Sequence, residues 1–190
     1  AKKLIDTGVT GIAYETVTSS DGSMPLLAPM STIAGQLAFV VGSYHLLKHN
    51  KGKGVMIGQM DDMDPRVVTV IGAGVAGTQS ILKAIDNKAL VKVVDSSQAK
   101  LDDLKSKYGS NNIEYILSTK DSIQVSINES DLVIGSVYVV GKEAPKVITR
   151  EMLSSMNPGT VMVDVSIDQG GCFESSKPTT HDSPTFLEND

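Results

Sequence analysis

The sequence has very little of the residue types that build covalently linked or metal-held structures. Its single cysteine, Cys172, cannot form an intrachain disulfide, and its three histidines lie too far apart for a zinc-binding motif. No apolar run reaches the length of a membrane-spanning helix, and the first residues lack the charged and apolar regions of a secretion signal. These absences favour a cytoplasmic protein that needs no metal.

Basic residues are also few, and they are scattered. The 190 residues include 17 Lys and Arg against 22 Asp and Glu, a formal net charge of −5, so no basic patch predicts nucleic-acid binding. Hydrophobic residues at 41% and charged residues at 21% are typical of a folded globular protein. The length suits one α/β domain with an attached arm.

The first fifty residues predict an arm followed by a long helix. A short helix is expected at residues 2–6, and the β-branched and apolar content of residues 9–17 predicts a strand. Two prolines predict that residues 25–29 are extended. Ser31 or Thr32 can then cap a helix that runs to about residue 47.

This expected helix leaves two interpretations open. Its apolar residues recur at roughly helical spacing: Ile33, Leu37, Val40, Val41, Tyr44 and Leu47. Gly35 and Gly42 lie inside it, where glycine costs about 0.5 to 1 kcal/mol relative to alanine, so each predicts a close approach of another element. The helix is either packed in the core or a surface that joins this domain to another lobe or subunit.

Residues 67–95 contain the strongest functional signal. A Val/Ile-rich segment at 67–71 predicts a buried strand, and Gly72-Ala73-Gly74-Val75-Ala76-Gly77 then opens a helix. In such a loop the first glycine allows the tight turn, the second lets a pyrophosphate approach the backbone, and the third lets the helix pack on the sheet. The free amides and positive dipole end of the helix favour the anion. The pattern predicts a dinucleotide site.

Asp95 favours NAD over NADP as the bound dinucleotide. It ends the strand predicted at 90–95, where its carboxylate can accept hydrogen bonds from the adenosine ribose hydroxyls and would repel a 2′-phosphate. The alternative role for Asp95 is a helix N-cap, and the two roles are compatible. Lys100 follows one helical turn later and could reach the ribose, although most exposed lysines are solvated.

The rest of the chain alternates between predicted strands and helices. After an acidic turn at 61–65 and the unit at 67–95, helices are expected at 97–108, 122–128 and 149–156, and strands at 113–117, 131–137 and 160–167. This alternation predicts a Rossmann-type α/β fold with a doubly wound parallel sheet. We expect residues 1–30 to form an arm, 31–50 a connecting helix and loop of a truncated second lobe, and 51–190 the NAD-binding domain.

A nicotinamide pocket is expected at the carboxyl ends of the later strands. The candidates are Ser118, residues 135–139 and residues 167–171. Asp168 stands out because a carboxylate beside two glycines can approach a nicotinamide or a substrate, although a turn-forming role explains it equally well. Asp164, inside its strand, is interpreted as structural, and Cys172 has no visible base partner for nucleophilic chemistry.

Several segments together closely resemble the alanine dehydrogenase family, over nearly all 190 residues. They are Tyr14–Val17, Asp21–Gly22, Pro25–Ser31, Ala34–Gly35, Gly72–Gly77, Asp131–Gly135, Val163–Cys172, Pro178–Thr180 and Ser183–Phe186. The Ile167–Cys172 motif is far more specific than the glycine loop. The related membrane transhydrogenase has a similar NAD-binding subunit but does not share the Pro25–Met30 stretch in this form.

The resemblance implies an enzyme that interconverts L-alanine and NAD with pyruvate, ammonia and NADH, usually as a hexamer. It implies that Asp168 is the active-site aspartate of the NAD domain. The other residues that it implies line the cofactor are Ser31, Asp95, Lys100 (where relatives often have arginine), Ser118, Val137, Val147 and Ile167, with the loop Gly72–Gly77.

The resemblance also implies that part of the enzyme lies outside these residues. The family's catalytic histidine, and the lysine and arginine that hold the substrate, belong to a lobe preceding this chain, and a further segment would follow it. We therefore expect an NAD-binding portion that is inactive when isolated. The alternatives are the NAD module of a transhydrogenase-like or lysine-pathway dehydrogenase, and a non-catalytic truncated form that binds NAD.

Overall fold

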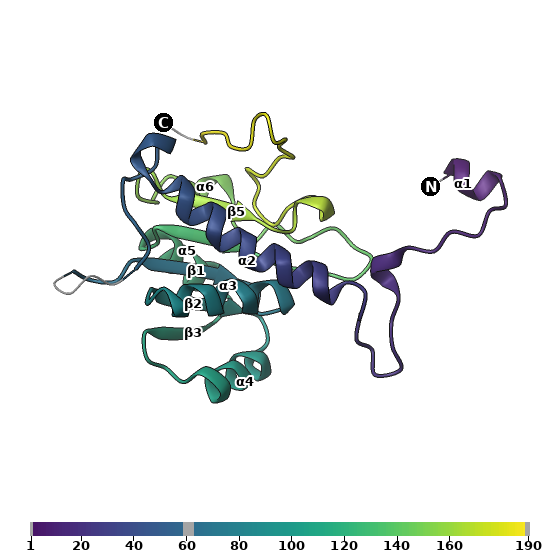
Figure 1. The fold of residues 1–190 in the computed structure, drawn as a ribbon, viewed down its shortest axis with the longest axis horizontal. Helices are drawn as coiled ribbons and strands as arrows, with labels where there is room; N and C mark the ends of the chain where they lie inside the picture. Colours follow the sequence, from purple (N-terminus) through teal and green to yellow (C-terminus); the bar gives the residue numbers. More distant parts are fainter. Residues whose placement is uncertain (1, 59–62, 189–190) are drawn as a thin grey trace.

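A five-stranded parallel sheet lies at the centre of the computed structural model, which describes residues 2–58 and 63–188 (Figure 1). The strands are β1 (Val67–Ile71), β2 (Leu90–Asp95), β3 (Ile113–Leu117), β4 (Leu132–Gly135) and β5 (Val161–Asp164). Their order is β3-β2-β1-β4-β5, so the order reverses between β1 and β4. In open sheets of this kind ligands bind at the carboxyl ends of the strands beside that reversal.

Helices cover both faces of the sheet, as predicted from the alternating pattern. The helices α2 (Ala28–His45), α3 (Val75–Asp86) and α4 (Gln98–Tyr108) supply buried residues to one core, and α5 (Lys120–Asn128) and α6 (Arg150–Leu153) supply the other. Alternate residues of β1 divide between them: Val68 and Val70 enter the first core and Ile71 the second. A sheet covered on both faces explains why its strands are almost continuously apolar.

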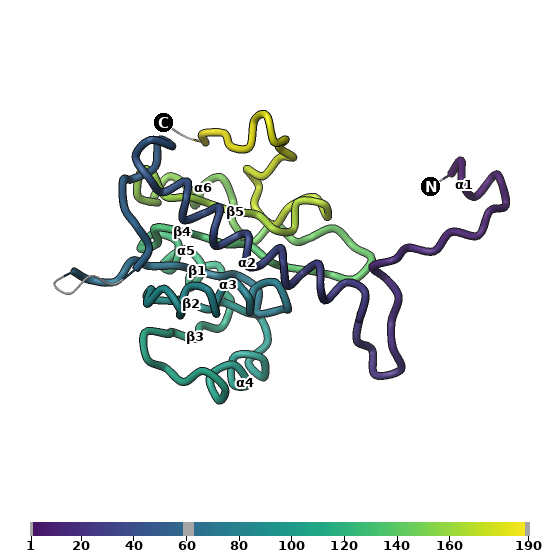
Figure 2. The backbone as a smooth tube through the Cα atoms, in the orientation of Figure 1, coloured from purple at the N-terminus to yellow at the C-terminus, as the bar shows by residue number. Residues whose placement is uncertain are grey.

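Helix α2 packs across α3 and the β4–β5 side of the sheet (Figures 1 and 2). A Cβ placed on Gly35 would lie 2.0 Å from the Ala76 carbonyl oxygen, and one on Gly42 would lie 2.4 Å from a Leu132 methyl. Both glycines therefore allow the close approach that their position predicted. Because Ala76 lies near the carboxyl edge and Leu132 near the amino edge, α2 runs antiparallel to the strands.

The apolar residues that the helical spacing singled out lie on the exposed face of α2, not in the core. The inward face consists of Gly35, Ala38, Phe39, Gly42 and Leu46, whereas the apolar residues at helical spacing point outward. Met30, Ile33, Leu37, Val40, Val41 and Tyr44 remain between 43% and 60% exposed. The sequence could not decide between the two interpretations because α2 is apolar on both sides; the buried side is the one that carries Gly35, against α3, and Gly42, against β4 and β5.

The arm forms less regular structure than predicted. It contains α1 (Lys2–Asp6) and a 3-10 turn η1 (Tyr14–Thr16), and Figure 1 shows it extending away from the sheet. The strand predicted at 9–17 is wrong, because this segment is exposed and pairs with no strand among the described residues. β-branched residues form a strand only where a partner edge exists.

Several predicted boundaries also need correction. Residues 25–29 are not extended: α2 begins at Ala28 with Pro29 in its first turn, where a missing N–H costs nothing, and neither Ser31 nor Thr32 caps it. The last strand ends at Asp164, and residues 167–169 form a 3-10 turn, η3 (Ile167–Gln169). The acidic turn predicted at 61–65 begins outside the described residues. Among the helices described, none is long and apolar enough to cross a membrane.

Candidate functional site

The three glycines of the loop after β1 have three different environments. Gly72 has φ +101°, and a Cβ on it would lie 2.5 Å from the Ser136 carbonyl oxygen. A Cβ on Gly77 would lie 1.8 Å from the Gly72 carbonyl oxygen, so the first turn of α3 presses directly against the loop. A Cβ on Gly74, in contrast, would meet nothing within 4 Å. The loop is packed on two sides and open at Gly74.

The open side leads to the amino end of α3. Gly74 is the N-cap of this helix and offers no side-chain cap, and the first backbone bond closes only at Thr78, whose N–H donates to the Gly74 carbonyl (2.9 Å). The amides of Val75, Ala76 and Gly77 precede that bond and have no intrahelical acceptor. Free amides, a helix dipole and an open backbone suit a pyrophosphate.

Asp95 ties this loop to the end of β2. It is only 7% exposed; its Oδ2 accepts from the Ala73 N–H (2.7 Å) and its Oδ1 from the Ser97 N–H (2.8 Å). Asp95 is not the N-cap of α4, since the Ser97 hydroxyl accepts from the Lys100 amide in that role. Each carboxylate oxygen keeps a second lone pair, so the group can still accept from a ribose.

Lys100 lies close to Asp95, as the sequence suggested. Its Nζ is 3.9 Å from Asp95 Oδ2, and its side chain is more than half exposed. An exposed pair at this distance contributes little to stability. Lys100 therefore lies beside Asp95 without being held firmly against it.

The ends of β3 and β4 border the same loop. The Ser118 N–H donates to the Asp95 carbonyl (2.9 Å), which places the half-buried Ser118 beside β2. Val137 is half-buried and follows Ser136 at the end of β4. Ser136 lies within the candidate range 135–139, but its role in holding the glycine loop was not predicted: its buried hydroxyl donates to the Gly72 carbonyl (2.8 Å) and fixes the loop.

Asp164 at the end of β5 has the structural role expected of it. Its carboxylate accepts from the N–H groups of Ser166 (2.9 Å), Cys172 (2.8 Å) and Phe173 (3.2 Å), and from the Ser176 hydroxyl. These bonds fold the chain after β5 back on itself. Burial of the Cys172 thiol, with the adjacent Asp164 carboxylate adding to the effect, raises the pKa of Cys172 to about 12. Cys172 is therefore a protonated core residue and no nucleophile.

The loop after β5 presents Asp168 at the same edge of the sheet. Ile167 is half-buried and Asp168 is exposed in η3, and Gly170 and Gly171 follow with φ +86° and +77°. Val147 reaches this region from a separate segment, since its N–H donates to the Cys172 carbonyl (2.8 Å). Two separate parts of the chain thus meet at Cys172, four residues after Asp168.

Ser31 comes to this edge on α2. It is half-buried one turn before Gly35, whose carbonyl accepts from the Ser80 hydroxyl (2.7 Å) of α3. The α2–α3 contact therefore brings Ser31 toward the amino end of α3. All the predicted residues lie at or near the carboxyl edge of the sheet.

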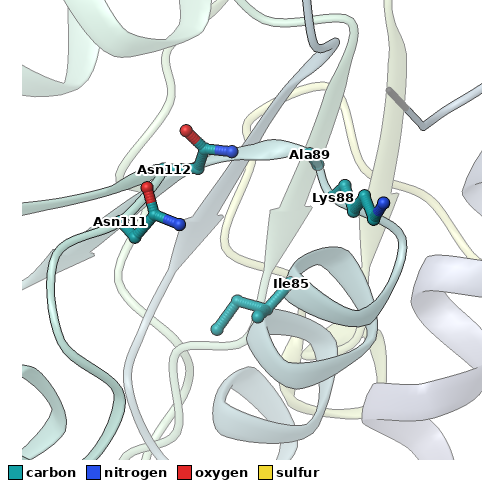
Figure 3. Close-up of a pocket in the computed structure, with 5 residues that line it drawn as sticks. All are labelled: Ile85, Lys88, Ala89, Asn111 and Asn112. Atoms are coloured by element: carbon teal, nitrogen blue, oxygen red, sulfur yellow. The ribbon is translucent and has the colours of Figure 1, made fainter. Parts of the chain in front are cut away.

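A cavity of about 230 Å³ lies elsewhere, lined by Ile85, Lys88, Ala89, Asn111 and Asn112 (Figure 3). These residues precede β2 and β3, so the cavity opens at the amino edge, opposite the glycine loop. Ligands of doubly wound sheets bind at the carboxyl edge, so we do not assign the dinucleotide to it. Within the described ranges, no three His, Cys, Asp or Glu side chains gather as metal ligands.

Residues 38–190 match the family described as "Alanine dehydrogenase/PNT, C-terminal domain". The chain belongs to this family.

Two curated members of the alanine dehydrogenase/PNT family show how far the likeness extends. Alanine dehydrogenase from Halomonas elongata is 48% identical over 186 residues, and that from Mycobacterium tuberculosis strain H37Rv is 46% identical over 187. Each alignment covers 98% of this chain but 50% of the relative. The chain therefore spans about half the length of these relatives.

Solved structures place the chain within the same family. An L-alanine dehydrogenase superimposes with a TM-score of 0.91 at 38% identity, covering 98% of this chain and 51% of the other. A transhydrogenase from Sinorhizobium meliloti superimposes with a TM-score of 0.69 at 27% identity, covering 80% and 44%. The alanine dehydrogenase likeness includes the arm and α2, whereas the transhydrogenase likeness covers less of the chain.

Proposed function

We propose that this chain is the NAD-binding half of an L-alanine dehydrogenase. One observation carries the proposal: the glycine loop is open only at Gly74, at the uncapped end of α3, and is tied to the buried carboxylate of Asp95. The family likeness over 98% of the chain supports alanine as the substrate. The transhydrogenase-like alternative has weaker support, since that likeness has lower identity and coverage.

The proposed reaction oxidises the amino acid and reduces the dinucleotide. L-alanine, NAD and water give pyruvate, ammonia and NADH: hydride leaves the alanine α-carbon for the nicotinamide, and water attack on the resulting imine releases ammonia. Asp168 orients the substrate or exchanges protons at the nicotinamide end. The general base comes from the lobe that the relatives carry in their other half.

The remaining site residues divide along the dinucleotide. We assign the adenosine ribose to Asp95 with Lys100, and the pyrophosphate to the loop Gly72–Gly77. Ser31, Ser118, Val137, Val147 and Ile167 are proposed to line the rest of the cofactor.

The same likeness supports a proposed division of the chain. Residues 1–30 would be an arm of the substrate lobe, 31–50 a connecting helix and loop, and 51–190 the NAD-binding domain. We place the complete enzyme in the cytoplasm.

The first test measures dinucleotide binding by the isolated chain. Calorimetry with NAD and NADP should show a preference for NAD, because the Asp95 carboxylate repels a 2′-phosphate. Asp95→Asn should weaken NAD binding about tenfold, because a charge-assisted hydrogen-bond acceptor is lost. It should also reduce the preference for NAD over NADP, because the neutral amide does not repel the 2′-phosphate. Asp103→Asn is the matched control, because Asp103 is an exposed residue of α4 that pairs with Lys107. Equal affinity of the isolated chain for NAD and NADP would contradict the assignment of Asp95.

The second test measures catalysis. The isolated chain should produce no NADH from alanine, whereas the longer protein that contains it should turn over alanine in preference to lysine-derived substrates. If the 190 residues alone produced NADH from alanine, the proposal that catalysis needs the other half of the enzyme would be wrong. A longer protein that binds NAD but oxidises none of these substrates would favour the non-catalytic alternative.

We further propose that the exposed face of α2 pairs with a second copy of the chain. Residues 28–45 contain no Asp, Glu, Lys or Arg. Two copies, each with a net charge of −5, can therefore meet there without bringing like charges together. The six exposed side chains offer on the order of 600 Å² per copy, and pairing would bury about 1,200 Å², the lower end of stable interfaces. Such a pair would be the building unit of the hexamer that the family resemblance implies.

A further inference from the structure

A strap, residues 144–148, lies along the segment that follows Asp168. The Ala144 N–H donates to the Gln169 carbonyl (2.9 Å), the Val147 N–H to the Cys172 carbonyl (2.8 Å), and the Glu174 N–H to the Ile148 carbonyl (2.9 Å). These bonds hold the strap against both ends of the 169–174 segment. They leave the Gly170 and Gly171 carbonyls, between those ends, without a bond to the strap's backbone.

The Lys146 ammonium bonds to both of these carbonyls. Its Nζ donates to the Gly171 oxygen (2.7 Å) and to the Gly170 oxygen. Both glycines have positive φ, a conformation that residues with side chains rarely adopt, and it turns two successive carbonyls toward one donor. An ammonium carries three donors on a flexible stem, so it can serve two acceptors at once.

This contact closes the loop that carries Asp168. On the upstream side, the Ser166 hydroxyl donates to the Val137 carbonyl (2.8 Å) and the Ser166 N–H to Asp164. On the downstream side, Lys146 supplies the side-chain contact to Gly170 and Gly171. Between these ties, the exposed Asp168 carboxylate accepts no hydrogen bond from the described residues, so its position depends on the loop backbone.

We propose that Lys146 is a positioning residue for the nicotinamide end of the site. Its ammonium fixes the Gly170–Gly171 backbone and thereby sets where the Asp168 carboxylate lies. The role of Asp168 in this inference rests on the proposed function. The contact between Lys146 and the two glycine carbonyls rests on the observed hydrogen bonds. The alternative is that Lys146 is an exposed lysine whose loss changes nothing.

The test compares two ligands on the 190-residue chain. ADP-ribose shares the adenosine and pyrophosphate of NADH and lacks the nicotinamide. Lys146→Met removes the donors, Lys146→Arg keeps a cation with donors, and Lys142→Met removes a lysine of the same connection whose side chain makes no hydrogen bond or ion pair to a described residue. Calorimetry gives both affinities, and hydrogen exchange follows the amides of residues 168–172.

Lys146→Met should bind NADH about tenfold more weakly and ADP-ribose within twofold of the unaltered chain, with faster exchange at residues 168–172. Lys146→Arg should recover most of the NADH affinity, and Lys142→Met should match the unaltered chain. Unchanged NADH affinity in Lys146→Met, or an equal loss for both ligands, would overturn the positioning role. If the unaltered chain binds neither ligand, the proposed function fails. In that case hydrogen exchange still tests the Lys146 contact: unchanged exchange at residues 168–172 in Lys146→Met would show that Lys146 does not fix the Gly170–Gly171 backbone.

Discussion

Two aspartates, one at the end of β5 and one in the turn that follows, show that local position decides what a carboxylate does. Asp164 accepts three backbone N–H groups and one hydroxyl, whereas Asp168, four residues later, faces solvent. Removing a buried acceptor leaves several donors unsatisfied, each at a cost of about 1 to 3 kcal/mol. The first is a fold determinant, and the second is free for chemistry.

Asp164→Ala should therefore lower the free energy of unfolding by about 2 to 4 kcal/mol, measured by urea denaturation at pH 7. Asp168→Ala is the matched control and should change it by less than about 0.5 kcal/mol, because an exposed carboxylate supports no buried donor. A stability loss of similar size in both variants would contradict the division of roles.

Cys172 predicts a pH dependence of stability. Its thiol pKa is raised to about 12 in the folded chain, from an ordinary value of 9.0. The stabilisation that follows is complete below about pH 9 and is lost as pH rises toward 12, because the unfolded chain releases the proton first. The urea midpoint should therefore fall more steeply between pH 9 and 11 in the native sequence than in Cys172→Ala. Parallel pH profiles of the two proteins would exclude this contribution.

At the scale of elements, the glycine loop separates a packing requirement from a binding requirement. Gly77→Ala would place a methyl 1.8 Å from the Gly72 carbonyl oxygen, so α3 must shift. Gly74→Ala meets no atom within 4 Å, and its φ of −77° is ordinary for alanine. The same substitution three residues apart should thus act on different properties.

We expect Gly77→Ala to lower the thermal midpoint by several degrees, consistent with an overpacking cost of about 1 to 3 kcal/mol. Gly74→Ala should keep the midpoint within about a degree and still lose NAD affinity by tenfold or more, because its methyl fills the pyrophosphate approach. Calorimetry measures the NAD affinity of each variant, and thermal melts measure its midpoint. A Gly74→Ala chain that binds NAD normally would show that the anion does not lie there.

The helices and strands also show which elements local sequence can predict. The unit 67–95 was predicted correctly because its period, turn glycines and terminal carboxylate all indicate the same structure. The strand predicted at 9–17 was wrong because β-branched content alone supplies no pairing partner. Likewise α2 began at Ala28 because a proline fits the first turn of a helix as well as an extended segment.

At the scale of the whole molecule, the exposed face of α2 predicts self-association. Leu37→Glu places a charge in the middle of that face and should shift sedimentation at about 100 µM from dimer toward monomer, while the variant stays folded. Val125→Glu, an equally exposed valine on α5, is the control and should leave association unchanged. Because Cys172 is fully buried, a disulfide formed by Leu37→Cys would also report two α2 helices that meet at residue 37. A monomeric native chain would contradict the proposed pairing.

The sequence by itself determined the βαβ unit and the family, and it predicts a preference for NAD, because these depend on residue types at short, fixed spacing. Only the tertiary structure decided which face of α2 is buried, which glycine of the loop is open, and that Lys146 reaches the carbonyls after Asp168. Those facts depend on contacts between segments far apart in the chain, such as Gly35 with Ala76 and Lys146 with Gly171. Local spacing does not encode such contacts, since they arise only when the sheet brings the segments together.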